Sequence, residues 1–284
     1  MNLKPALRPC GSVEPSAVRG EIRLEGVTFS YPRSSKRVID ELSMTIRPGE
    51  TVAIVGQNGA GKTTLAKLIT CLYQATGGEV LIDGIPIHDY DTKALHQRMA
   101  FVFQRPTRYE ATALDNIAFG DWRRLLDCPE EVHRIARSAR VDEMIRGLPQ
   151  GYDTLLGRMF GDEDLSGGQW QKLAIARSLA CDPSIVILDE PAANLDVNAE
   201  YDLYQGVQEL IRDRTTILIS HRFSTVRMAD RIFVLDEGRI VEEGNHDELL
   251  GREGTYAAMC KVHEATLRLN TRTPSSNFPV QKAG

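Results

Sequence analysis

Short apolar segments of strand length lie in two groups along the chain, separated by a longer and more polar stretch of helical composition. The first group lies at 22–29, 38–46 and 51–55, and the second lies at 185–188, 216–219 and 232–235. The segment 51–55 leads through glycines into a helical pattern over 64–72, and the polar helical stretch covers about 92–180. Strands that alternate with helices favour a mostly parallel sheet. We therefore predict an α/β fold with a helical insertion between two groups of strands.

The two ends of the chain differ in composition from the region between them. Residues 1–20 are rich in Pro, Gly and Ser, which predicts a flexible linker, and residues 263–284 have the composition of a disordered tail. We expect residues 21–262 to form the folded domain, with its helical part at about 105–180. A chain of 284 residues is long enough for this arrangement.

Composition argues against several functional classes. Hydrophobic residues make up 42% and charged residues 26% of the chain, as in soluble globular proteins. The net charge of -5 gives no indication of a nucleic-acid surface. No apolar run approaches the roughly 18 residues needed to cross a bilayer, and Pro5, Pro9 and Gly11 interrupt any signal-peptide core. The five cysteines are scattered without a C-x-x-C pair, which favours free thiols in a reducing cytosol over disulfides or metal binding.

A candidate phosphate-binding loop lies between the strand at 51–55 and the helix at 64–72. It has the pattern G-x-x-x-x-G-K-[ST], formed by Gly56, Gln57, Asn58, Gly59, Ala60, Gly61, Lys62 and Thr63. Glycines let backbone N–H groups surround phosphate oxygens, and the start of the following helix favours negative charge. In this interpretation Lys62 reaches the β- and γ-phosphates and the Thr63 hydroxyl binds Mg²⁺. A chance match occurs in roughly 1% of chains of this length when glycine makes up about 7% of residues.

Three polar residues that follow later strands are expected at the same edge of the sheet. Asp189 and Glu190 follow the segment 185–188, and His221 follows 216–219. The carboxyl ends of parallel strands meet at one edge, where ligands bind. In a P-loop nucleotidase an acidic residue here holds Mg²⁺, which fits Asp189, and Glu190 would take a proton from an attacking water. The alternatives are a solvated strand end for both carboxylates and a structural role for the histidine.

A second glycine-containing motif lies in the helical region. Ser166 is a good helix N-cap, but Gly167 and Gly168 would then occupy the first turn, where glycine weakens a helix. Glycine is tolerated where something must approach the backbone closely, so Ser166, Gly167, Gly168 and Gln169 predict a second anion-binding helix start. Two phosphate sites of different kinds suggest that two chains meet head to tail, each capping the nucleotide of the other.

With these motifs in place, residues 20–262 resemble the nucleotide-binding domain of ATP-binding cassette (ABC) transporters. The phosphate loop resembles the Walker A loop, Leu165–Gln169 the ABC signature and Ile185–Glu190 the Walker B strand. Four more residues match positions with roles in that family: Tyr31 (adenine stacking), Gln104 (Q-loop), Asp196 (D-loop) and His221 (switch histidine). The signature, in register with the other motifs, is highly specific to the family.

The resemblance implies a P-loop NTPase fold with a RecA-like core, an antiparallel β-subdomain and an inserted α-helical subdomain. It implies an ATPase that holds ATP and Mg²⁺ between two cassettes. ATP would contact Tyr31, residues 56–63, Thr64 and Gln104 of one chain, and Ser166 to Gln169 of the other. The catalytic residues would be Glu190, His221 and Lys62, the Mg²⁺ ligands Thr63, Gln104 and Asp189, and the link between the two sites Asp196.

The resemblance also implies partners. They are a transmembrane domain, on the same polypeptide or on a separate subunit, and a second nucleotide-binding domain in a homodimer or heterodimer, with no nucleic acid. The chain would act at the cytoplasmic face of the plasma (inner) membrane without a transmembrane segment of its own. Residues 20–31 and 224–250 are exporter-like, which favours export. In the family the region after the Q-loop receives the membrane domain. Tyr109 is suited to anchor that contact, and the alternative is a tyrosine that packs on its own domain.

The chain differs from the family pattern near the signature, and two other functional classes are alternatives. Arg158 stands where exporter cassettes often carry a glutamate before the signature, and Trp170 replaces a more usual basic residue. The effect of the first change on coupling stays open. An ABC-type ATPase of DNA repair or translation is the alternative function, although the chain has neither a long coiled coil nor a second cassette. A small-molecule kinase would not need the signature. The transported substrate stays open, because its site lies in the membrane domain.

Overall fold

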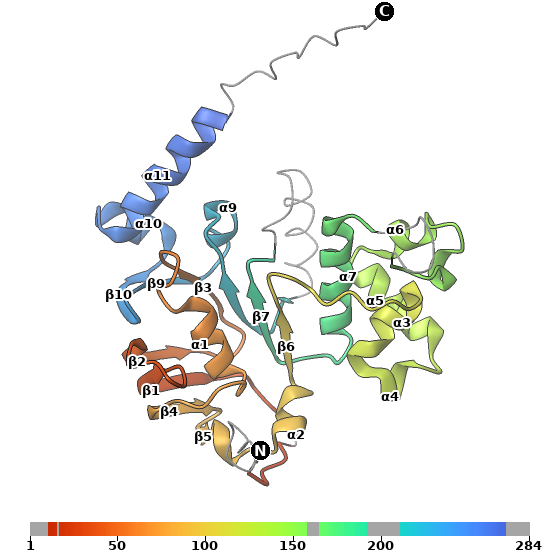
Figure 1. The fold of residues 1–284 in the computed structure, drawn as a ribbon, viewed down its shortest axis with the longest axis horizontal. Coiled ribbons are helices and arrows are strands. Elements are labelled where there is room, and N and C mark those ends of the chain that lie inside the picture. The colour runs from red at the N-terminus through yellow and green to blue at the C-terminus, as the bar shows by residue number, and fades with distance from the viewer. Residues whose placement is uncertain (1–10, 16, 158–164, 192–210, 271–284) are drawn as a thin grey trace, which may run out of the picture.

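The computed structural model describes residues 11–15, 17–157, 165–191 and 211–270. This part of the chain forms two sheets, helices around them and a group of helices to one side (Figure 1). None of the helices described combines the length and the apolar composition needed to cross a lipid bilayer.

The larger sheet has its strands in the order β10-β9-β3-β8-β7-β6. These strands are β3 (Thr51–Val55), β6 (Met99–Val102), β7 (Ile185–Asp189), β8 (Thr215–Ile219), β9 (Arg231–Asp236) and β10 (Arg239–Gly244). Pairing is parallel from β9 to β6, and only β10 runs antiparallel, to β9. Strands β7 and β8 are buried at every position, as expected for strands covered on both faces. The mostly parallel sheet predicted from the sequence is confirmed.

The smaller sheet is antiparallel and has the order β2-β1-β4-β5. Its strands are β1 (Ile22–Ser30), β2 (Arg37–Ile46), β4 (Gly77–Ile82) and β5 (Ile85–Pro86). Buried and exposed residues alternate along most of β2, as in a sheet with one face packed on the core. This sheet is the antiparallel β-subdomain that the resemblance implied.

One prediction of local structure was wrong. The stretch 92–180 was predicted to be helical throughout, but Met99–Val102 form β6 at the edge of the larger sheet. Four apolar residues have neither a helical nor a strand period, so the pattern alone does not distinguish the two. Parallel pairing with β7, from Met99 beside Ile185 to Val102 beside Leu188, determines the outcome.

The helices fall into those that cover the larger sheet and those inserted between β6 and β7. The α-helices are α1 (Lys62–Ile69), α2 (Thr92–His96), α3 (Ala113–Ala118), α4 (Trp122–Leu125), α5 (Pro129–Ser138), α6 (Asp142–Arg146), α7 (Gly167–Leu179), α9 (Phe223–Val226), α10 (His246–Gly251) and α11 (Thr255–Asn270). Short 3₁₀ turns lie at η1 (Ile87–Asp89), η2 (Phe119–Asp121) and η3 (Gly151–Asp153). Helices α3 to α7 share a separate core around Trp170, a residue that is 1% exposed. They form the inserted helical subdomain.

Helices α1 and α7 pack on opposite faces of the larger sheet. Leu65 and Leu68 of α1 belong to the same buried cluster as Ile54 and Ile187. Ile175 and Leu179 of α7 belong to the cluster on the other face, which includes Val55 and Leu188. Because α7 also contributes to the core of the helical subdomain, it joins that subdomain to the sheet.

Both ends of the described chain are ordered beyond the predicted domain limits. Helix α11 continues to Asn270, past the predicted limit at residue 262. At the other end, the Asp83 carboxylate accepts hydrogen bonds from the backbone N–H groups of Arg19, Gly20 and Glu21. Val18 is buried, so the segment directly before β1 lies against the domain.

Candidate functional site

The phosphate-binding loop follows β3 and ends at the start of α1. Gly61 is the N-cap of α1 and has a φ of 107°, a region that side chains other than glycine rarely adopt. A Cβ atom on Gly61 would lie 2.8 Å from the Val38 carbonyl oxygen and 2.9 Å from Cδ1 of Ile39. The loop therefore needs glycine here both for its conformation and for its close approach to β2.

Lys62 turns back into the loop that precedes it. Its Nζ donates hydrogen bonds to the carbonyl oxygens of Gly56, at 2.8 Å, and Gln57, at 2.9 Å. The side chain is buried. Burial lowers the pKa of Lys62, while the charges of Glu190 and Asp189 oppose this shift. A buried ammonium hydrogen-bonded to neutral carbonyls is a favourable partner for an anion such as phosphate.

Thr63 and Asp189 form the next part of the site. The Thr63 hydroxyl donates to Oδ2 of Asp189 at 2.9 Å. Asp189 ends β7 and is buried. Burial raises its pKa, although the hydrogen bond from Thr63 acts in the opposite direction. A bound cation would favour the ionised carboxylate, because an opposite charge nearby lowers a carboxyl pKa.

Glu190 connects residues from three adjacent strands. Its Oε2 accepts a hydrogen bond from Nε2 of Gln104, which follows β6, at 2.7 Å. Its Oε1 lies 3.1 Å from Nδ1 of His221, which follows β8. The backbone of Glu190 has a φ of 49° and its N–H donates to the Ile219 carbonyl. The chain therefore turns sharply after β7, and the turn places the carboxylate between the glutamine and the histidine.

Tyr31 lies beside the phosphate loop, close to the end of β1. Its hydroxyl is 2.9 Å from Oγ1 of Thr64 in α1. The tyrosine ring meets the ring of Phe29 nearly edge to face, with centroids 5.0 Å apart. The structure thus joins two residues that the sequence assigned to ATP binding, although they are far apart along the chain.

Ser166 to Gln169 begin α7, away from this cluster. The Ser166 hydroxyl accepts from the Gln169 N–H at 3.2 Å, and the Gln169 side chain accepts from the Ser166 N–H at 2.8 Å. This reciprocal capping box satisfies two helix-end donors. Gly167 is exposed, and a Cβ atom there would meet nothing within 4 Å. Packing within the described chain therefore does not explain this glycine.

The structure places the sequence-predicted residues in two groups. Lys62, Thr63, Gln104, Asp189, Glu190 and His221 lie together at the carboxyl edge of the sheet, with Tyr31 and Thr64 beside the loop. Ser166 to Gln169 lie in the helical subdomain, at the start of a helix that packs on the face opposite α1. Asp196 and Arg158 lie outside the described residues.

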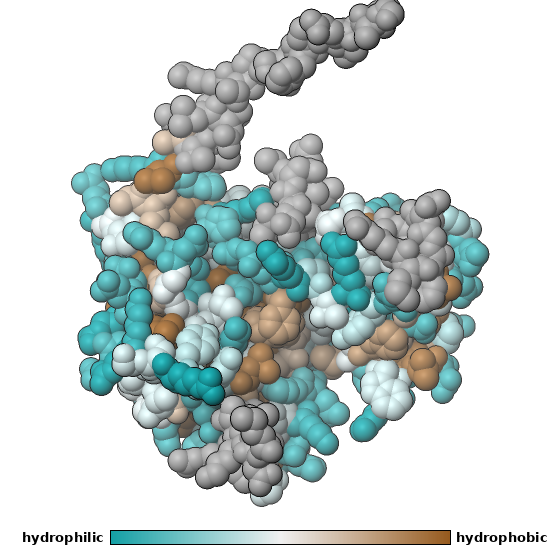
Figure 2. All heavy atoms as spheres, viewed as in Figure 1, coloured by the Kyte–Doolittle hydropathy of each residue, from teal (hydrophilic) through white to brown (hydrophobic). Residues whose placement is uncertain are grey.

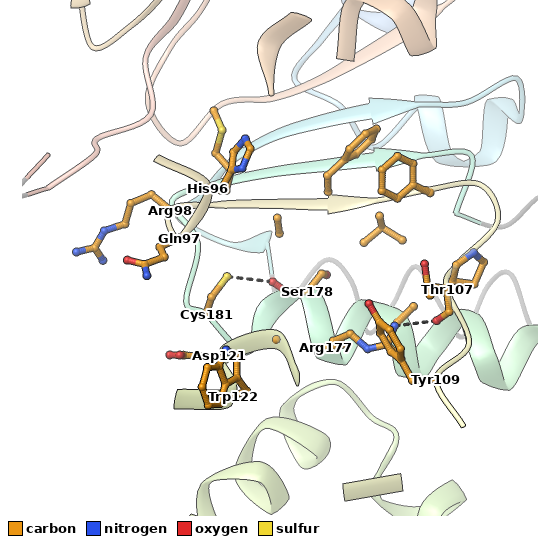
Figure 3. A pocket seen from close by; sticks show the side chains of 18 of the residues that line it. His96, Gln97, Arg98, Thr107, Tyr109, Asp121, Trp122, Arg177, Ser178 and Cys181 are labelled. Carbon is orange, nitrogen blue, oxygen red and sulfur yellow. Dashed lines mark hydrogen bonds between the residues drawn. The ribbon is translucent and has the colours of Figure 1, made fainter. Parts of the chain in front are cut away.

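A cleft of about 880 Å³ lies between β6 and the helical subdomain, and the motifs alone did not predict it. Figure 2 shows apolar side chains in the hollow between these two parts of the molecule. Tyr109, Arg177 and Trp122 line the cleft (Figure 3). Phe103 also contributes to its lining. Tyr109 is 42% exposed.

Arg177 of α7 holds the segment that carries Tyr109. Its guanidinium group donates to the carbonyl oxygens of Thr107 and Asn116 and to the side chain of Asn116. It also lies 4.5 Å from the centroid of the Tyr109 ring. Burial lowers the pKa of Arg177 to about 10, and the guanidinium group remains charged at neutral pH. Helix α7 and the segment after Gln104 are therefore directly linked.

Comparisons with known proteins agree with this arrangement. The family model described as ABC transporter matches residues 39–193. The ATP-dependent lipid A-core flippases of Pseudomonas aeruginosa and Aromatoleum aromaticum are each 42% identical over 250 residues, which cover 88% of this chain and 41% of theirs. A solved structure of a bacterial Atm1-family ABC exporter with ATP bound matches with a TM-score of 0.80 and 36% identity, over 89% of this chain and 43% of that one.

The chain thus spans less than half the length of these relatives. Its motifs, its two-sheet core with the inserted helical subdomain, and the structural match all agree with the resemblance inferred from the sequence. The chain belongs to the ABC transporter family, in which it is a nucleotide-binding ATPase domain of the exporter type.

Proposed function

We propose that this chain binds MgATP at the carboxyl edge of its larger sheet and hydrolyses it with Glu190 as the general base. One observation carries the proposal: Glu190 lies between Gln104 and His221, beside the Thr63–Asp189 pair. A nucleotide-binding loop, an acidic pair and a histidine are the groups that phosphoryl transfer to water needs at one place.

The oxygen atoms of this site suit Mg²⁺. Thr63 and Asp189 present a hydroxyl and a carboxylate side by side, and Gln104 adds an amide oxygen nearby. Within the described residues, no group of three or more His, Cys, Asp and Glu side chains could hold a metal ion alone. Mg²⁺ commonly uses one or two carboxylates together with substrate phosphates, which fits the Asp189 carboxylate beside Thr63. Bound Mg²⁺ would neutralise charge on those phosphates.

The chain's own residues have separate tasks in the proposed reaction. Lys62 holds the β- and γ-phosphates by its buried ammonium group. Glu190 accepts a proton from the attacking water, and the Gln104 amide keeps the carboxylate oriented. The ring of His221 is about half exposed and contacts Glu190 through Nδ1, which leaves Nε2 as the atom to meet the γ-phosphate. The adenine base would stack on Tyr31.

Ser166 to Gln169 would act on the nucleotide of a second chain. Gly167 is exposed, and no neighbouring group of the described chain requires a glycine there. This supports close approach of another molecule to the start of α7. Helix α7 packs on the sheet face opposite α1, so its first turn lies away from the phosphate loop of the same chain. Two chains related by a two-fold axis would place the start of α7 of each chain against the phosphate loop of the other. Asp196, outside the described residues, would link the two sites.

The membrane partner would dock in the cleft beside β6. Its lining combines half-exposed aromatic residues with the segment after Gln104, so a docked helix could act on the residue that orients Glu190. The relatives are named as flippases and as an exporter, which supports export as the process driven. This chain would then work at the cytoplasmic face of a membrane, next to a transmembrane domain, and the substrate would be bound by that domain.

Replacement of Tyr109 by alanine tests the docking surface. In the isolated chain, we expect ATP hydrolysis to stay within about twofold of wild type, since the interactions of Tyr109 with Asn116, Phe119 and Arg177 lie outside the nucleotide site. In the complete transporter, hydrolysis should become uncoupled from transport, or assembly should weaken, as truncation of an interface aromatic predicts. Transport and ATPase activity in vesicles measure both effects.

Leu126→Ala is a matched control for Tyr109→Ala, because Leu126 is an exposed apolar residue of the same subdomain outside the cleft. It should leave transport unchanged. If the Tyr109→Ala transporter assembles and exports normally, the docking surface is wrongly placed. Loss of hydrolysis in the isolated variant would instead show that Tyr109 serves the packing of its own domain.

Phosphate release from MgATP by the chain tests the proposed function as a whole. Because two chains would form each site, turnover per chain should rise with protein concentration and then reach a plateau. Removal of Mg²⁺ with EDTA should abolish turnover. Turnover per chain that is independent of concentration over the whole range would contradict a shared site.

A further inference from the structure

Three aromatic rings form a cluster beside the phosphate loop: Phe29, Tyr31 and Tyr73. Tyr31 meets Phe29 at an interplanar angle of 81° and Tyr73 at 87°, with centroids 5.0 and 5.4 Å apart. The centroids of Phe29 and Tyr73 are 5.5 Å apart, which closes the triangle. Phe29 belongs to the core between the two sheets, and both tyrosines pack against that core. The aromatic cluster is therefore supported by the packed core.

The backbone around Tyr73 is fixed from two sides. The chain reverses direction after α1 at Cys71, whose φ is 55°, and the N–H groups of Leu72 and Tyr73 both donate to the Lys67 carbonyl. Three residues later, the N–H and the hydroxyl of Thr76 both donate to the Thr28 carbonyl in β1. The backbone that carries the Tyr73 ring is therefore held by α1 and β1 through hydrogen bonds that do not involve Tyr31.

Tyr31 is held mainly through its side chain. Its hydroxyl contacts Thr64, and the two other rings restrict how its own ring can turn. A side chain that is ordered before a ligand arrives loses less conformational freedom on binding. A base that stacks on Tyr31 would thus benefit from neighbours that hold the ring in one orientation.

We propose that Tyr73 is a positioning residue of the adenine site, which holds the Tyr31 ring in the orientation that stacks on the base. The inference rests on the proposed role of Tyr31 in ATP binding. Tyr73 itself contacts Phe29, Tyr31 and the Lys67 ammonium, whose Nζ lies 5.9 Å from its ring centroid. It therefore acts on the base through Tyr31 and leaves the phosphates to the loop.

Tyr73→Ala should weaken binding of MgAMP-PNP, a non-hydrolysable ATP analogue, by about threefold to tenfold, the range of one aromatic pair. KM for MgATP should rise by a similar factor, while kcat changes by less than about twofold, because the reacting groups are untouched. Tyr73→Phe should have the wild-type affinity for MgAMP-PNP and the wild-type KM for MgATP, since the described residues offer the Tyr73 hydroxyl no hydrogen-bond partner. Calorimetric titration and steady-state phosphate release give these constants.

Inorganic tripolyphosphate separates a base effect from damage to the loop, because it carries the phosphates without a base. Its inhibition constant with Mg²⁺ should be the same in wild type and Tyr73→Ala. A parallel loss for tripolyphosphate and MgAMP-PNP would overturn the inference, since the change would then act through Lys67 and α1.

The double variant Tyr31→Ala/Tyr73→Ala shows whether Tyr73 acts through Tyr31. It should bind MgAMP-PNP no more weakly than Tyr31→Ala alone, whereas additive losses would overturn the inference. If Tyr31→Ala weakens binding and Tyr73→Ala does not, only this inference fails. If Tyr31→Ala binds normally, the proposed stacking on Tyr31 fails, and the inference fails with it.

Discussion

Glu190→Gln should bind MgATP normally but hydrolyse it about 10²–10⁴ times more slowly, the contribution usual for general-base catalysis. The amide keeps the size of the side chain and can still meet Gln104, but it cannot accept the proton of the attacking water. ATP should therefore persist in the site, and the variant should accumulate as an ATP-bound dimer. Single-turnover hydrolysis measures the rate, and gel filtration with MgATP measures the association.

Glu253→Gln is the matched control for Glu190→Gln. Glu253 is an exposed glutamate with a φ of 50°, close to that of Glu190, and it lies in the turn before α11. It should retain wild-type hydrolysis and dimerise only transiently. If Glu190→Gln keeps full turnover and stays monomeric with MgATP, neither the catalytic role nor the ATP-dependent pairing is correct.

Lys62→Ala should lose nucleotide binding itself, which distinguishes it from Glu190→Gln. Lys62 would donate to two phosphate groups, and a hydrogen bond from a charged donor contributes about 1.5–3 kcal/mol. The loss of both corresponds to a fall in ATP affinity of about 10²-fold or more. Equilibrium binding of MgAMP-PNP by calorimetry gives the affinity directly.

The melting temperature of Lys62→Ala must be measured as well, because Nζ also donates hydrogen bonds to the carbonyl oxygens of Gly56 and Gln57 and its loss could destabilise the loop. Lys261 is an exposed lysine on α11, and Lys261→Ala should leave both the affinity for MgAMP-PNP and the melting temperature unchanged. A folded Lys62→Ala chain with wild-type affinity would show that the loop is not the phosphate site.

Much of the larger sheet could be predicted because its central strands are buried on both faces. Such strands are apolar runs of the kind seen at Thr51–Val55 and Ile185–Leu188, and their parallel pairing places Lys62, Asp189 and His221 at one edge. The Met99–Val102 strand was missed, because its structure depends on pairing with β7 and not on its own pattern.

Contacts across the fold could not be predicted in the same way. The hydrogen bond from Gln104 to Glu190 depends on the positions of the segments that follow β6 and β7. The Tyr31–Thr64 contact depends on how β1 lies beside α1. Tyr73 belongs to no motif, and its position follows from the turn at Cys71. The role of Arg177 likewise could be identified only from the three hydrogen-bond acceptors that its guanidinium group meets on neighbouring segments.

Mixing of two inactive variants tests most directly the claim that ATP is hydrolysed between two chains. Lys62→Ala lacks a working phosphate loop, and Ser166→Arg should lack a working signature while still binding ATP. A mixed pair would contain one complete site, formed by the loop of the second variant and the signature of the first.

Phosphate release by each variant alone and by their equimolar mixture is the measurement. We predict that the mixture recovers up to about a quarter of wild-type turnover, since half of random pairs are mixed and each has one intact site of two. A mixture no more active than the two variants measured separately would contradict the shared site.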